Sequence, residues 1–290
     1  MILISNNNKV NTSDKENLHE NNNLEDLSKN RDDYYEDDKK NTSFLRSLAG
    51  LVTFSTIIPL GIYTSIEAVI SVIWLWPLLN ALIGLGGVVI AYILLKLFNM
   101  SHLLVATIVI SYIFLIMGYN HIDGLLDFSD GIMVHGDSKK KINVMRDSMV
   151  GTAGISTMVI FTVMTVAVLT NLIDYNCLWG ILVGEMSAKV SLLTTCILSK
   201  PAEDGIGKYF VEDMPITNYI TAVLISGIIA YIFLGYVGLF GLIGAIIAGA
   251  LISYIAKRNF GVATGDVLGT SNEIGRLLSL IFIVITIPLF

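Results

Sequence analysis

Three aspartates within one short stretch are the residues best suited to chemistry. Residues 120–131 read NHIDGLLDFSDG, so that Asp123, Asp127 and Asp130 follow one another at intervals of four and three residues. If the preceding apolar helix continues through them, this spacing stacks the three carboxylates on one face. Adjacent carboxylates repel one another unless cations or protons neutralise them, and oxygen ligands of this kind suit Mg²⁺ or Mn²⁺. The stretch therefore predicts a divalent-metal site that could receive substrate phosphates.

A cationic stretch follows the acidic one. Residues 139–154 read KKKINVMRDSMVGTAG, and the guanidinium of Arg146 can grip a phosphate in two places. We predict that Arg146 binds substrate and that Asp147 beside it is catalytic. The three consecutive lysines are better explained as determinants of membrane topology.

A third polar stretch precedes the last apolar run. Residues 264–273 read TGDVLGTSNE, and backbone N–H groups at a helix N-terminus make an anion site. We predict that Gly265 and Asn272 bind substrate and that Asp266 joins the metal ligands, although Glu273 is also suited to capping the final helix. Lys208, in a separate connection, is a weaker candidate for anion binding.

The elements that position these stretches are apolar helices. The chain has 290 residues, of which 54% are hydrophobic and only 14% are charged, a composition typical of an integral membrane protein. Runs of about twenty apolar residues predict an all-α polytopic bundle of about seven transmembrane helices. The predicted spans are residues 74–98, 102–118, 154–173, 177–199, 218–236, 238–256 and 274–290. Residues 44–72, which Pro59 and Gly61 interrupt, predict an interfacial or re-entrant segment.

The first 43 residues differ from the rest. They hold ten asparagines, six Lys or Arg and ten Asp or Glu, and such a segment cannot bury enough apolar surface to order itself. We predict a disordered, polar, acidic tail over residues 1–43 and a membrane-embedded catalytic domain over residues 44–290. Nothing in the charge pattern indicates nucleic-acid binding.

Orientation follows from the basic residues. The three longer connections carry Lys139 to Lys141 with Arg146, then Lys200 and Lys208, then Lys257 and Arg258, whereas the short connections carry none. Basic loops stay in the cytoplasm, so we expect the polar stretches and the N-terminus to be cytoplasmic, in the plasma membrane. Glu185 and Lys189, four residues apart inside a span, predict either a neutralised structural bridge or a polar cavity.

The ordered motifs resemble one family. FLRSLAGLVTFSTIIPLG at 44–61, HIDGLLDFSDG at 121–131, MRDSMVGTAG at 145–154, GIGKYF at 205–210 and TGDVLGTSNE at 264–273 are similar to cobalamin synthase, also called adenosylcobinamide-GDP ribazoletransferase or cobalamin 5′-phosphate synthase. The resemblance covers most of residues 44–290. The tail is a departure, because the family generally lacks one.

The resemblance implies a reaction. Enzymes of this family join adenosylcobinamide-GDP to α-ribazole or its 5′-phosphate and release GMP, with Mg²⁺ required, so we expect these substrates, Mg²⁺ with Mn²⁺ as a substitute, and association with other corrinoid-assembly enzymes. In such a transfer, Asp127 or Asp130 could act as general base, and the three aspartates of the acidic stretch mainly as metal ligands. The resemblance leaves open whether the acceptor is α-ribazole or its phosphate.

Two rival functions fit less well. A CDP-alcohol phosphotransferase would carry Asp-Gly-x-x-Ala-Arg, and no Ala-Arg pair follows Asp123 and Gly124 at that spacing. An ion-coupled transporter would place charges near the middle of several spans and show a two-fold repeat, and we find no convincing repeat.

Overall fold

The part of the chain that the structure describes is helical. The computed structural model describes residues 43–62 and 64–290, and within them no β-strand forms beyond an isolated bridge between Pro201 and Ala263. The predicted tail lies outside the described residues, except for Ser43, whose hydroxyl caps the first helix through the Arg46 N–H. The longer helices are α2 (Phe44–Ser55), α4 (Trp76–Lys96), α5 (His102–Ile116), α6 (Asn120–Met133), α8 (Thr152–Asp174), α9 (Trp179–Leu198), α11 (Ile216–Asn259) and α12 (Gly265–Thr286). Shorter ones are α3 (Ile66–Ser71), α7 (Ser138–Met145) and α10 (Ile206–Glu212).

These helices confirm an all-α, multi-pass membrane protein. Among the described residues, five helices are long and apolar enough to cross a membrane, or six if the bent pair of α5 and α6 counts as one span. The number falls below the predicted seven because residues 218–236 and 238–256 both belong to α11. The α11 backbone is non-helical at Gly235 (φ 57°, ψ −138°).

Contacts show that α11 doubles back at Gly235. A Cβ added at Gly227 would lie 3.7 Å from a methyl carbon of Leu242, whereas fifteen residues of straight helix span about 22 Å. The 44-residue element is therefore a hairpin of two apolar arms. Each arm corresponds to one of the predicted spans, with the turn at Gly235 instead of residue 237.

A sharp bend separates α5 from α6. The prediction that one helix continues past Gly118 is wrong, because Gly118 (φ 65°) and Tyr119 (φ 60°) both adopt left-handed conformations. The two helices consequently meet at 91°. α6 nevertheless contains all three aspartates of the acidic stretch, so the helical spacing on which that prediction depended is retained.

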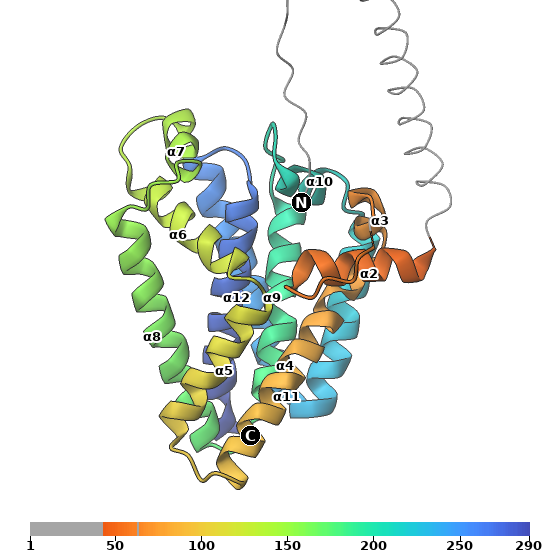
Figure 1. Cartoon of the computed structure of the whole chain (residues 1–290), viewed down its shortest axis with the longest axis vertical. Helices are drawn as coiled ribbons and strands as arrows, with labels where there is room; N and C mark the ends of the chain where they lie inside the picture. The colour runs from red at the N-terminus through yellow and green to blue at the C-terminus, as the bar shows by residue number, and fades with distance from the viewer. Residues whose placement is uncertain (1–42, 63) are drawn as a thin grey trace, which may run out of the picture. The chain divides into compact units, whose positions relative to one another are not determined.

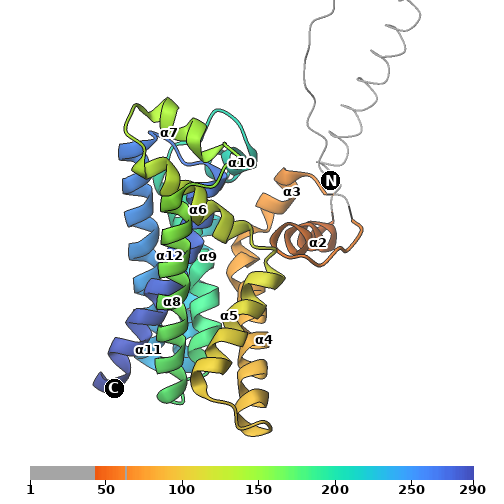
Figure 2. The same ribbon diagram turned by 60° about the vertical axis from the view of Figure 1, so that its left-hand side comes forward.

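The centre of the bundle is α9. It packs against α4, α11 and α12, and nearly all of its side chains are buried. α2 instead runs across the direction of the long helices (Figure 1) and is too short to span, in agreement with the interfacial or re-entrant segment predicted there. Two views show α6, α7 and α10 at one end of the bundle, with the C-terminus at the other (Figures 1 and 2).

Candidate functional site

The acidic helix α6 crosses the N-terminal end of α12 at close range. A Cβ added at Gly124 would lie 3.0 Å from the Cα of Asp266, so only glycine permits this approach. The Thr270 hydroxyl fastens the crossing by hydrogen bonding to the carbonyl oxygens of Gly124 (3.0 Å) and Asp266 (2.8 Å). Two motifs that lie far apart in sequence thus meet, as their predicted common role requires.

Asp127 lies among three other carboxylates. This side chain is partly buried, and the negative charges of Asp123, Asp266 and Asp130 all act on it. Asp127 itself has no hydrogen-bonding partner in the part of the chain that the structure describes. Such a concentration of like charge favours a cation nearby.

The carboxylates do not form a ready-made metal cage. Within residues 43–62 and 64–290, no three His, Cys, Asp or Glu side chains lie in an arrangement that could hold a metal ion. Mg²⁺ does not need one, because it is usually bound by one or two carboxylates together with water and substrate phosphates. The donor set therefore fits Mg²⁺ shared with a substrate, and Asp123, Asp127, Asp130 and Asp266 as ligands stay a prediction.

Asp130 is engaged differently from its neighbours. It is buried, with 8% of its surface exposed, and its two carboxylate oxygens accept hydrogen bonds from the backbone N–H groups of Gly151 (2.7 Å) and Gly154 (2.8 Å). These groups belong to the start of α8, whose N-cap residue Gly151 has no side chain to cap it. Asp130 thus caps α8 from another helix and compensates the positive end of its dipole. Its role as a base or metal ligand stays a prediction.

A polar cavity of about 250 Å³ opens beside the acidic helix. The residues that line it include Arg146, Asp204, Gly207, Thr264, Gly265 and Asp266. Arg146 hydrogen bonds to Asp204, but both side chains are at least half exposed, so that ion pair is weak and the guanidinium can exchange partners. A Cβ at Gly265 would meet nothing within 4 Å, which leaves the start of α12 open toward a ligand.

Asp123, Asp127 and Asp130 do not line this cavity, and three other predicted residues lie outside its lining as well. The exposed Asp147 accepts a hydrogen bond from the Met149 N–H (3.1 Å), and Lys208 lies 3.8 Å from Glu212. Asn272 is fully buried and donates to Glu273 (3.0 Å). The structure therefore does not bring them to the polar cavity with Arg146 and Gly265.

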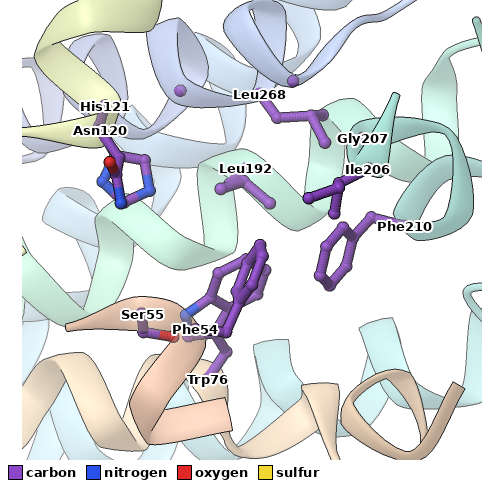
Figure 3. A pocket seen from close by; sticks show the side chains of 12 residues that line it. Phe54, Ser55, Trp76, Asn120, His121, Leu192, Ile206, Gly207, Phe210 and Leu268 are labelled. Carbon is purple, nitrogen blue, oxygen red and sulfur yellow. The ribbon is translucent and has the colours of Figure 1, made fainter. Parts of the chain in front are cut away.

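A second cavity, of about 310 Å³, adjoins the first. We call it the aromatic cavity, because Phe54, Trp76 and Phe210 line it together with His121, among others (Figure 3). The two cavities share Ile206, Gly207 and Gly265 as lining residues. Close packing of α10 on the loop before α12 shapes this shared wall, since a Cβ at Gly207 would lie 2.5 Å from the Gly265 nitrogen.

A fully buried charge network supports the site from within the bundle. Arg276 on α12 pairs with Glu185 on α9 and with Glu273. Glu185 and Lys189 therefore do not form the bridge with each other that was one prediction. Lys189 instead lies 2.9 Å from Nε2 of His121 and 4.6 Å from the centre of the Trp76 ring. Arg276 thus has both buried carboxylates as partners, which compensates the cost of their burial.

Several residues of the two cavities and the charge network were not identified from the sequence. Arg276 lies within the predicted last span, and a charge at that depth is itself a signal of a structural or functional site. His121 stands inside the acidic motif but was given no role. Phe210 belongs to the GIGKYF motif, whereas nothing in the sequence marks Trp76 as facing a cavity.

Comparison with known proteins gives one consistent answer. The model of the family described as cobalamin-5-phosphate synthase matches residues 47–284. The adenosylcobinamide-GDP ribazoletransferase of Methanosarcina barkeri is 28% identical over 85% of this chain and 94% of its own length. The protein of the same name from Pyrococcus abyssi is 32% identical over 73% of this chain and 87% of its own length. No solved structure matches the chain.

Proposed function

The chain belongs to the cobalamin-5-phosphate synthase family, and we propose that its transfer reaction takes place where α6 crosses the start of α12. Members of this family join adenosylcobinamide-GDP to ribazole, and this chain does so as a multi-pass membrane protein. The observation that carries the placement is the meeting of Asp123, Asp127 and Asp266 beside the polar cavity that Arg146 lines. Carboxylates and a guanidinium together are what a diphosphate and its metal counter-ion require.

The transfer is a phosphoryl substitution. A ribose hydroxyl of the acceptor forms a new bond to the cobinamide-linked phosphorus, the bond to GMP breaks, and the hydroxyl proton passes to a carboxylate. Asp127 is the better base, because its oxygens accept no hydrogen bond within residues 43–62 and 64–290, whereas those of Asp130 accept two from backbone N–H groups. Arg146 binds the phosphate oxygens on which charge accumulates.

The proposal includes a divalent cation. Asp123 and Asp266 would hold Mg²⁺, or Mn²⁺ in its place, and Asp127 adjoins both. When bound, the ion supplies positive charge to the diphosphate. The carboxylates orient that ion, and the crossing of Gly124 over Asp266 keeps the two sets of donors together.

The site faces the cytoplasm in this proposal. Its support is that α7, with its three lysines, and α10 lie at the same end of the bundle as α6 (Figure 1). Basic connections remain on the cytoplasmic side, where nucleotide-activated substrates are made. A plasma-membrane location would also place the chain beside other corrinoid-assembly enzymes.

The test is direct product formation. Protein purified in liposomes receives adenosylcobinamide-GDP with α-ribazole, or with α-ribazole 5′-phosphate, in Mg²⁺ and then in excess chelator. We expect GMP and the joined corrinoid in Mg²⁺, and neither in chelator. Equal turnover in both conditions would overturn the metal assignment, and the faster acceptor identifies the substrate.

A further inference from the structure

The aromatic cavity is built from three rings that reach it from three different helices. Phe54 on α2, Trp76 on α4 and Phe210 on α10 have ring centroids 5.1 to 5.9 Å apart. Figure 3 shows the rings of Phe54 and Trp76 together below Leu192, with Phe210 to their right and His121 on the other side. Rings arranged in this way present faces and edges on which a flat aromatic ligand can pack.

Among the described residues, two that line this cavity each carry a buried polar atom without a partner. Within the described residues, neither the indole Nε1 of Trp76 nor Nδ1 of His121 has a hydrogen-bonding partner, although both atoms are buried. Trp76 as a whole is 3% exposed. Leaving a buried polar group unpaired is costly, so each such group calls for a ligand or ordered water.

The unpartnered Trp76 nitrogen is a hydrogen-bond donor, because an indole nitrogen can only donate. Nδ1 of His121 donates or accepts according to the tautomer of the ring, whose Nε2 lies 2.9 Å from the Lys189 amine. The cavity therefore offers an aromatic wall with a donor on Trp76.

Size and chemistry restrict the occupant. At about 310 Å³, the cavity lies at the lower end of the range of about 300 to 1,000 Å³ that ligand pockets span. It can hold one fused two-ring base but not a corrin macrocycle. Leu192, Ile206 and Leu268 add apolar side chains to the lining. This lining suits the base of ribazole, a largely apolar heteroaromatic whose one unsubstituted ring nitrogen accepts a hydrogen bond, better than it suits guanine with its several polar groups.

We infer that the aromatic cavity binds the heteroaromatic base of the ribazole acceptor, with Trp76 donating to its free ring nitrogen and the aromatic wall of Phe54 and Phe210 packing against it. The inference rests on the proposed function for the identity of the ligand. Because the cavity shares Gly207 and Gly265 with the polar cavity, a base in one places its ribose toward the phosphates in the other. The aromatic cavity is thus the specificity-determining part of the site.

Steady-state kinetics of Trp76→Phe provide the first test. This substitution keeps an aromatic ring and deletes the donor, so the KM for α-ribazole should rise about three- to tenfold, while the KM for adenosylcobinamide-GDP and kcat at saturating α-ribazole change less than twofold. Trp179→Phe, at a partly exposed position that stacks on Phe233, is the matched control and should change neither. An unchanged KM for α-ribazole in Trp76→Phe, or a rise confined to adenosylcobinamide-GDP, would overturn the inference.

A binding measurement separates this inference from the proposed function. The chain has three tryptophans, so the Trp74→Phe, Trp179→Phe double variant retains Trp76 as its sole tryptophan. Titration with α-ribazole alone should quench the emission of Trp76 saturably, and guanosine should not. Quenching without turnover would support the cavity assignment and contradict the proposed function. Turnover without quenching would overturn the cavity assignment and leave the proposed function standing.

Discussion

Asp130 Oδ1 accepts a 2.8 Å hydrogen bond from the backbone N–H of Gly154. This bond links the acidic helix α6 to the first turn of α8, and the second oxygen of Asp130 makes the equivalent bond to Gly151. A carboxylate placed at a helix N-terminus satisfies orphan N–H groups and meets the positive end of the helix dipole. The acidic motif therefore has an architectural member, Asp130, as well as Asp127, which lies near Asp266 at the polar cavity.

The fit of α8 against Asp130 depends on glycine. We expect Gly154→Ala to destabilise the protein by about 1 to 3 kcal/mol, because the added Cβ would lie 2.6 Å from Asp130 Oδ2 and 2.7 Å from the Leu126 carbonyl oxygen. Thermal unfolding in detergent measures the change. Gly227→Ala is the control, since its Cβ would find an ordinary contact at 3.7 Å. Equal melting temperatures for the two variants would contradict the packing argument.

The buried charge network should be costly to break. Glu185→Gln leaves Arg276, which is 1% exposed, with one carboxylate instead of two, and removing one partner of a buried ion pair costs about 3 to 5 kcal/mol. The free energy of unfolding, followed by denaturant titration in detergent, should fall by that order. Glu203→Gln, at an exposed position, should leave it within about 0.5 kcal/mol. Similar values for both variants would show that the network contributes little to stability.

Arg146 should act on substrate binding and not on folding. Charge-assisted hydrogen bonds contribute about 1.5 to 3 kcal/mol, so Arg146→Gln should lower kcat/KM for adenosylcobinamide-GDP by about ten- to a hundredfold. Its melting temperature should stay unchanged, because the pair with Asp204 is exposed. Arg258→Gln, which removes a surface contact with Tyr254, serves as the control for lost positive charge. Unchanged kcat/KM in Arg146→Gln would remove this residue from the site.

Sequence patterns predicted the features that depend on local spacing. Long apolar runs gave the spans, and the intervals between Asp123, Asp127 and Asp130 correctly placed these residues within one helix. The bend at Tyr119 was not predicted, because a left-handed conformation in a non-glycine residue is set by the packing around it. The apolar runs also do not predict which helices contact one another.

The pairing of the buried charged side chains was the other feature that could not be predicted from the sequence. Glu185 stands four residues from Lys189, yet it pairs with Arg276, 91 positions away. A helical interval shows only that two side chains share a face, and the strongest partner of a buried carboxylate comes from whichever helix packs against it. For the same reason the aromatic cavity could not be predicted from the sequence, because its rings come from α2, α4 and α10.

The most direct test of the central claim is turnover by Asp127→Asn. GMP release from adenosylcobinamide-GDP and α-ribazole is measured in liposomes with Mg²⁺, for wild type, Asp127→Asn and Asp137→Asn. The control residue, Asp137, only caps α7. If the carboxylates at the crossing of α6 and α12 carry the transfer, Asp127→Asn should lower kcat by about a hundredfold or more, with wild-type stability, while Asp137→Asn stays close to wild type. Wild-type kcat in a folded Asp127→Asn protein would contradict the account.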